Sequence, residues 1–265
     1  TVVALFTWVF WRPLKISTFD ESFAQSIGVR TGPLGFALVI VAALAAGFLL
    51  FLNSCVAVPP RLKGRPAILD AEVAVGSDGR RTLGKSWFLA RKGASQLYVE
   101  GDPFTLGYSN AELTKEFMQE QERSLIGTVR EFFPSPVSFL AVATMVLINN
   151  RSLPSFVSEE HQIEILGLSM AGTDPYPEYG SRYHRILNYH AAHDISHWVW
   201  DKPIVGCTAF AARGAKTEGG ALLVGRNFDF EAGRHFDTNK IIGVYRPSRG
   251  QAFLSVSWPG MAGAV

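Results

Sequence analysis

The chain opens with uncharged stretches and becomes mixed in polarity after its first quarter. Leu34 to Leu52 is a run of nineteen residues without a charged side chain. A helix of this length can cross a hydrocarbon core of about 30 Å. Because no face of the run is polar, we expect a transmembrane helix rather than the buried helix of a globular core.

The segments on either side of this run complete the N-terminal organisation. Residues 1–33 contain a further apolar stretch, Val2 to Trp11, which predicts the end of an earlier membrane helix. Residues 53–65 form a linker. The chain starts with Thr1 rather than methionine, so we expect a fragment of a longer protein.

Residues 66–265 alternate short apolar runs with turns that contain glycine or proline, a pattern typical of an α+β domain. Strands are predicted over Ala71 to Val75 and Ser95 to Glu100. A helix is predicted over Asn110 to Arg130, with Asn110 as its N-cap. Val137 to Ile148 is too short to span a membrane, so we expect a buried core helix.

Four further strands are predicted near the end of the chain. Cys207 to Ala212 and Ala221 to Arg226 flank a segment that holds three glycines, which favours an antiparallel hairpin. Lys240 to Tyr245 and Ala252 to Ser257 follow. Four successive strands joined by short turns fit one antiparallel sheet.

Such a hairpin would place Cys207 beside Arg226 and Asp229. A guanidinium favours the thiolate form of a nearby cysteine, and the thiolate is the nucleophile. Gly206 accepts strained backbone geometry, so the Gly206–Cys207 bond is a candidate for self-cleavage. The α-amine released on Cys207 could take the proton of its own thiol, with Asp229 orienting that amine.

These residues also resemble a known family. Cys207-Thr208 followed by Gly225-Arg226-Asn227-Phe228-Asp229 is similar to the N-terminal-nucleophile (Ntn) hydrolases of the penicillin acyltransferase, choloylglycine hydrolase and acid ceramidase group. The turn at residues 101–108 and the Pro259-Gly260-Met261 stretch resemble other motifs of that family. The resemblance covers roughly residues 66–265.

The resemblance implies an αββα sandwich of antiparallel sheets and self-cleavage into a heterodimer of residues 66–206 and 207–265. Cys207, Arg226 and Asp229 would be catalytic, and Thr208 and Asn227 would support the substrate. The substrate would be a small-molecule N-acyl amide or acyl donor, without a cofactor or a catalytic metal. Hydrolysis and acyl transfer remain equally open. An oxyanion-hole asparagine would lie beyond Val265.

Two other functional classes remain open. His190, His193 and His197 share one face if their segment is helical, which is compatible with a metal-dependent hydrolase. The segment lacks the HExxH pattern. The second alternative is a membrane-anchored binding domain without catalysis.

Charge and cysteine content narrow the possible partners and exclude one structural class. The net charge is +2, and no basic stripe is interleaved with aromatics, so we expect no nucleic-acid partner. The two cysteines, Cys55 and Cys207, are too few for a disulfide framework. Cys55 follows Leu52-Asn53-Ser54, which resembles a lipoprotein cleavage box, but a cysteine that simply ends the helix is an equal alternative.

The membrane orientation depends on which basic residues face the cytoplasm. Arg61, Lys63 and Arg65 follow the apolar helix and taken alone would weakly keep the domain inside. An earlier membrane helix would instead make residues 12–30, with Arg12, Lys15 and Arg30, a cytoplasmic loop. We therefore expect the C-terminal domain on the outer, periplasmic or extracellular, face.

Overall fold

The computed structural model describes residues 31–192, 194–195, 205–230 and 235–263. The chain divides into two compact units, Thr1–Cys55 and Val56–Val265. Each unit is described by itself.

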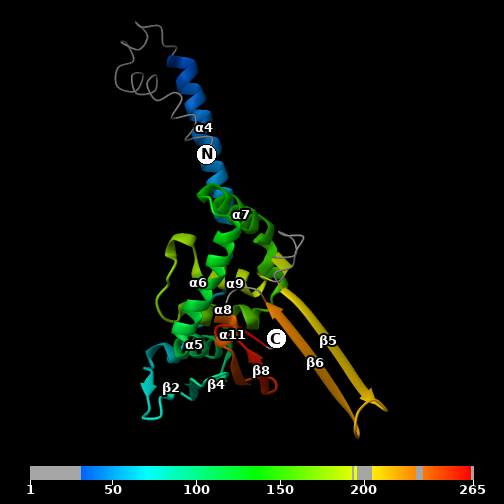
Figure 1. Cartoon of the computed structure of the whole chain (residues 1–265). Coiled ribbons are helices and arrows are strands. Elements are labelled where there is room, and N and C mark those ends of the chain that lie inside the picture. Colours follow the sequence, from blue (N-terminus) through cyan, green and yellow to red (C-terminus); the bar gives the residue numbers. More distant parts are fainter. Residues whose placement is uncertain (1–30, 193, 196–204, 231–234, 264–265) are drawn as a thin grey trace. The chain divides into compact units, whose positions relative to one another are not determined.

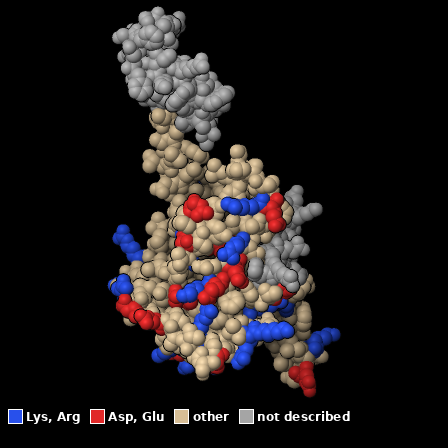
Figure 2. Space-filling model, turned by 60° about the vertical axis from the view of Figure 1, so that its left-hand side comes forward, with Lys and Arg blue, Asp and Glu red and all other residues tan. Residues whose placement is uncertain are grey.

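The described part of the first unit is one helix, α4 (Thr31–Ser54, 24 residues), which confirms a helix over Leu34–Leu52. Its apolar side chains are exposed, with Leu44 and Leu50 each 70% exposed. In Figure 2 the helix that follows the grey residues shows no blue or red side chain. Exposed apolar surface of this extent needs a lipid or protein environment.

No single helix of the described residues is both long and apolar enough to cross a membrane. Within α4, Ile40–Ser54 is an apolar stretch that is shorter than a membrane span. Lys115–Phe132 and Pro136–Phe156 reach the required length and composition only as a pair, and the pair is bent by 115°.

The second unit is built on a six-stranded mixed sheet in the order β1-β2-β3-β4-β7-β8 (Figure 1). β4 and β7 are parallel, and the other neighbouring strands are antiparallel. The strands are β1 (Ala74–Val75), β2 (Arg81–Leu83), β3 (Ser86–Leu89), β4 (Ser95–Gly101), β7 (Ile241–Pro247) and β8 (Phe253–Ser257).

The four late strands do not form the single sheet expected from the sequence. β5 (Val205–Gly214) and β6 (Gly220–Phe230) form a separate two-stranded sheet. β7 instead pairs with β4 over seven register positions, so its neighbour comes from a distant part of the chain. Local turns identify hairpins, but they carry no information about such long-range pairing. The described residues do not test the predicted αββα sandwich.

The side chains of β7 explain how the sheet is buried. Ile241, Gly243 and Tyr245 face the core, whereas Ile242 and Val244 alternate with them and are exposed. The Tyr245 ring stacks on Phe253 at 4.9 Å between centroids. This period of two is typical of a strand with one buried face.

Helices cover the sheet and form a second cluster of buried residues with one another. The α-helices are α5 (Pro103–Leu113), α6 (Lys115–Phe132), α7 (Pro136–Asn149), α8 (Glu159–Met170), α9 (Arg182–His190) and α11 (His235–Thr238), and the 3₁₀ helices are η1 (Ala67–Asp70), η2 (Asn150–Phe156) and η3 (Pro177–Tyr179). A Cβ on Gly107 would lie 1.9 Å from the Glu164 carbonyl oxygen. The helices α5 and α8 therefore touch backbone to backbone, which only glycine permits here.

The predicted helix over Asn110–Arg130 is two helices, and Asn110 is not a cap. It lies inside α5, which begins after Asp102, whose carboxylate accepts a hydrogen bond from the Thr105 backbone N–H at 2.8 Å. The chain breaks at Thr114 before α6 begins. Asn110 is fully buried and bonds a distant loop, so its polar side chain serves tertiary structure.

The predicted helix over Val137–Ile148 is present as α7, but the prediction that it is buried is wrong. Val142 is its only buried residue, while Val137 is 79% and Leu140 is 59% exposed. An apolar run indicates that a helix avoids water, but it does not identify what covers the helix.

Candidate functional site

The β5–β6 hairpin has the antiparallel arrangement predicted from the sequence. Cys207 pairs with Phe228, Thr208 with Asn227, and Ala209 with Arg226. The turn uses Gly214, Gly219 and Gly220, all with positive φ, which glycine adopts at least cost.

This register brings the predicted thiol and cation together. An Arg226 terminal nitrogen lies 3.9 Å from the Cys207 sulfur, and both residues are exposed. Residues that lie two register steps apart on neighbouring strands face the same side of a hairpin, which explains their approach. The thiol and the guanidinium therefore lie on the same side of the hairpin.

Asp229 occupies a different register position. Its backbone is paired with Gly206, one residue before Cys207, and the contacts of the Asp229 side chain lie outside the description. The structure thus joins Cys207 and Arg226, while the predicted contribution of Asp229 stays a prediction. Gly206 and Cys207 both lie within β5.

The surroundings of the hairpin site are open. Phe210 is 65% exposed and Val224 is 69% exposed. Gly225 lies beneath the Phe210 ring, whose nearest atom is 2.3 Å from the position of an added Cβ. Catalytic sites usually exclude water around the reacting atoms, and the described residues of the hairpin do not provide such an enclosure.

The predicted histidine face is described only at His190. Its Nδ1 bonds the Ile186 carbonyl oxygen at 2.8 Å, and its Nε2 accepts the Ala262 backbone N–H at 2.8 Å. Burial lowers the pKa of His190 and keeps the ring neutral. Both nitrogens are therefore used within the fold. His193 and His197 lie outside the described residues, and no cluster of three or more potential metal ligands occurs among the residues that are described.

His190 belongs to a set of buried and half-buried side chains that hold residues 260–263. Asn110 accepts the Gly260 backbone N–H at 3.2 Å and donates to the Met261 carbonyl oxygen at 3.3 Å. Burial raises the pKa of Glu164 to about 7, although a hydrogen bond from the Gly263 backbone opposes this shift. The Pro259-Gly260-Met261 stretch, noted as a motif, thus has a packing function in the structure.

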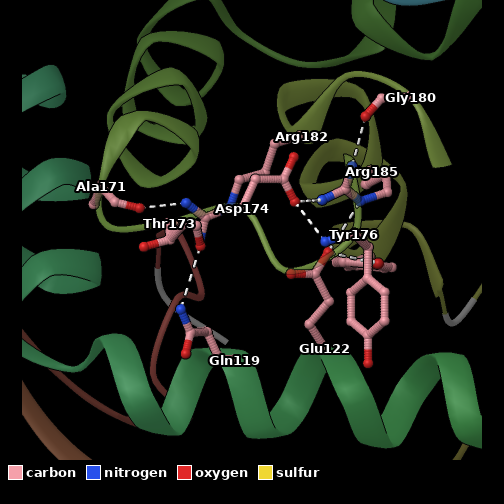
Figure 3. Close-up of polar contacts among 10 residues, drawn as sticks. Gln119, Glu122, Ala171, Thr173, Asp174, Tyr176, Gly180, Arg182 and Arg185 are labelled. Atoms are coloured by element: carbon pink, nitrogen blue, oxygen red, sulfur yellow. Dashed lines mark hydrogen bonds and ion pairs between the residues drawn. The ribbon is translucent and has the colours of Figure 1, made fainter. Parts of the chain in front are cut away.

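A buried ionic network was not predicted from the sequence (Figure 3). Arg185 of α9 bonds Glu122 of α6 at 3.0 Å and Asp174 at 2.5 Å. Its third contact is the Gly180 carbonyl oxygen at 2.6 Å, and Tyr189 donates to Glu122 at 3.0 Å. Residues so far apart in sequence carry no local pattern that would reveal their pairing.

The network contains polar atoms without a described partner. Glu122 is 3% exposed, and its second carboxylate oxygen has no hydrogen-bond partner in the described part of the chain. Arg182 donates to the Ala171 carbonyl oxygen, but its Nε is likewise without a described partner. Buried ion pairs of this kind hold elements in one arrangement, here α6 against α9.

A cavity of about 520 Å³ opens at the ends of β4 and β7. Lys85, Glu100 and Arg246 contribute its charges. The Lys85–Glu100 ion pair at 3.0 Å and the Tyr98 hydroxyl at 2.5 Å occupy both carboxylate oxygens of Glu100. The volume is in the range of small-molecule sites, although much of its charge is paired internally.

Comparison with known proteins indicates a different family from the one that the hairpin motif resembles. Residues 1–53 match the ABC 3 transport family. An uncharacterized protein of Archaeoglobus fulgidus is 26% identical over 183 residues, which is 64% of this chain and 30% of the relative. The chain thus spans about a third of the length of that relative. No solved structure matches the chain.

These comparisons correct the family expected from the hairpin. The match to a transport family, together with a relative of no known function, contradicts the assignment to the Ntn hydrolases. The self-cleaving amidohydrolase or acyltransferase function is overturned with it, and no support remains for an N-acyl amide substrate or a cleaved heterodimer. The Cys207-Thr208 and Arg226-Asn227 pairs are short, which explains how they misled: few residues define the motif. The expectation of a membrane protein agrees with the transport-family match.

Proposed function

We propose that this chain belongs to a membrane protein that acts in transport, with its N-terminal part in the bilayer and the six-stranded sheet of its C-terminal unit outside it. The observation that carries this proposal is the match of residues 1–53 to the ABC 3 transport family. The match includes most of α4, whose uncharged and exposed surface is suited to lipid.

An ATP-dependent transport protein works with a subunit that binds and hydrolyses ATP. The test is therefore to tag the full-length chain, solubilise membranes in mild detergent, and assay the purified material for ATP hydrolysis. We expect ATPase activity to accompany the tagged chain. Leu44→Arg places a charge in α4 and should reduce both membrane retention and copurifying activity, whereas Leu44→Met should leave both unchanged. A chain that stays in the membrane and never brings ATPase activity would refute the transport assignment.

We further propose that the C-terminal unit lies on the outer face of the membrane. Residues 1–30 lie outside the described residues, so this proposal rests on the sequence, in which the basic residues Arg12, Lys15 and Arg30 follow the apolar stretch Val2 to Trp11.

The two cysteines supply the orientation test. Cys207 is exposed and Cys55 is buried, so a membrane-impermeant maleimide should label intact cells through Cys207. Cys207→Ser should abolish this labelling. If labelling requires broken cells, the unit faces the cytoplasm.

As a second proposal, the C-terminal unit carries enzyme-like thiol chemistry at Cys207. The 3.9 Å approach of Arg226 to the sulfur supports this, because a nearby cation stabilises the negative charge that a sulfur nucleophile carries as it reacts. We expect Arg226→Gln to slow alkylation of Cys207 by iodoacetamide about threefold or more. Arg213→Gln, which changes an exposed arginine on the same hairpin, should leave the rate unchanged. Equal rates in wild type and Arg226→Gln would show that the cation does not activate the thiol.

A further inference from the structure

The helix α7 presents an apolar surface that the described residues leave uncovered. Its sequence, PVSFLAVATMVLIN, contains no charged residue. Val142 is its only buried member, and Val137, Leu140 and Met145 are 79%, 59% and 38% exposed. The helix therefore places a continuous apolar surface where a water-soluble domain would place polar side chains.

Exposed aromatic residues precede and follow α7 in the sequence. Phe132 precedes the helix and is 54% exposed, and Phe156, at the end of η2, is 82% exposed. Aromatic rings gather where hydrocarbon meets the headgroup layer of a bilayer. Here they bracket an uncharged helix.

Arginines stand at the same two borders. Arg130 lies over the Phe139 ring, with 5.7 Å from its guanidinium carbon to the ring centroid, and donates to the Tyr179 hydroxyl. Arg151 donates to the Ile148 carbonyl oxygen at 2.9 Å at the C-terminal end of the helix. Cations at the rim of an apolar surface complement the anionic headgroups of lipids.

We infer that α7, with Phe132 and Phe156, inserts into the surface of the same bilayer that holds the N-terminal part of the chain. This inference rests on the membrane association of the chain and not on transport. Fourteen residues of helix extend about 21 Å, which is short of the roughly 30 Å hydrocarbon core. The 115° bend between α6 and the α7–η2 segment likewise fits a helix that enters one leaflet rather than a straight span.

Lipid fits this surface better than a protein partner does. A helix that docks on protein usually shows an apolar stripe with a polar opposite face. The residues of α7 are apolar around the whole helix, and Ser138 and Thr144 are its only hydroxyl-bearing members. The exposed part of α7 therefore has no polar side that would face water, and a bilayer is an environment that accepts such a surface.

The test uses the full chain in nanodiscs that contain anionic lipid. Leu140→Cys in a Cys207→Ser background carries a bimane fluorophore, while Cys55 is buried and remains unlabelled. Lipids with a doxyl group quench fluorophores within the bilayer. We expect quenching at position 140 of about twofold or more relative to discs without doxyl lipid. The matched control is Leu254→Cys on β8, a leucine that is 63% exposed, where no quenching is expected.

A second variant separates this inference from membrane anchoring. Val137→Glu, added to the labelled chain, places a carboxylate on α7 and should abolish quenching at position 140. The chain should still elute with the nanodiscs, because α4 is unchanged. An unquenched label at position 140 in chains that coelute with discs would overturn the inference and leave membrane anchoring intact. A label that is shielded from water but unquenched would identify a protein contact and overturn it equally.

Discussion

The six-stranded sheet and the β5–β6 hairpin are both made of apolar strands, but the sheet has one buried face, whereas the hairpin residues whose burial is described are exposed or half-buried. Leu97 in β4 is 1% exposed, whereas Val224 in β6 is 69% exposed. The sheet is covered by α5, with Leu106 and Leu113 in its cluster, while the described residues of the hairpin contribute to neither cluster. Strand sequence therefore determines that a segment is extended, and its tertiary neighbours determine how much stability it contributes.

The largest expected effect lies in the buried network that joins α6 to α9. Arg185→Ala leaves Glu122 as a buried carboxylate without its cation and should lower the free energy of unfolding by about 3–5 kcal/mol. Lys85→Ala removes an ion pair in which Lys85 is 77% exposed, and should cost less than about 1 kcal/mol. Chemical denaturation of the full chain in detergent measures both. Equal losses would mean that the network does not hold α6 against α9.

Truncating one residue in each region tests the comparison directly. Leu97→Ala should cost about 2–5 kcal/mol, because it opens a cavity in the sheet core. Val224→Ala should change the free energy of unfolding by less than about 0.5 kcal/mol, because its side chain is already in solvent. A large loss for Val224→Ala would show that the hairpin is covered in solution.

Two glycines give a similar contrast through backbone contacts. Gly107→Ala drives a methyl group into the Glu164 carbonyl and should cost about 3 kcal/mol as α5 and α8 separate. Gly225→Ala meets only the Phe210 ring, which can swing into solvent, and should cost less than about 1 kcal/mol. Thermal unfolding of the two variants tests whether the Phe210 ring moves aside for a methyl group and the Glu164 carbonyl does not.

The smallest expected effect is a pH dependence at Glu164. Its folded pKa of about 7 is raised by burial, so the folded state binds the proton more tightly than the unfolded state. This stability is present below the unfolded pKa and is lost as pH rises through about 7. Glu164→Gln should match wild type at pH 5 and exceed it by on the order of 2 kcal/mol at pH 8.

His190 contributes with the opposite sign, because its folded pKa is lowered by burial. The stability that neutral His190 contributes is present above the unfolded pKa and is lost as pH falls through the folded pKa. Glu159→Gln, an exposed substitution on the same helix as Glu164, serves as the control and should leave the pH profile unchanged. A Glu164→Gln profile parallel to wild type would exclude Glu164 as the titrating group.

Local patterns in the sequence predicted which segments form helices and strands better than they predicted what packs against those segments. The helix over Leu34–Leu52, the strand over Ser95–Glu100 and the β5–β6 hairpin all follow from runs and turns that a single segment contains. The β4–β7 pairing and the Arg185–Glu122 contact join distant segments, so no local pattern in the sequence predicts them. The exposure of α7 could not be predicted either, since an apolar run looks alike in a protein core and in lipid.

At the candidate site, sequence spacing correctly placed Cys207 near Arg226, because hairpin register follows from the turn. It could not establish a function. The same short motif led to the wrong family, and the transport match lay in a segment whose composition had indicated only a membrane. Short motifs specify contacts, whereas longer matches are needed to specify activity.

The central claim is that the N-terminal part of this chain resides in a bilayer. The most direct measurement is flotation of the full-length chain with lipid on a density gradient after extraction at alkaline pH in carbonate. We predict that the chain floats with the lipid, because a helix in the hydrocarbon core resists this extraction. A chain that is released as soluble protein by carbonate would contradict the account.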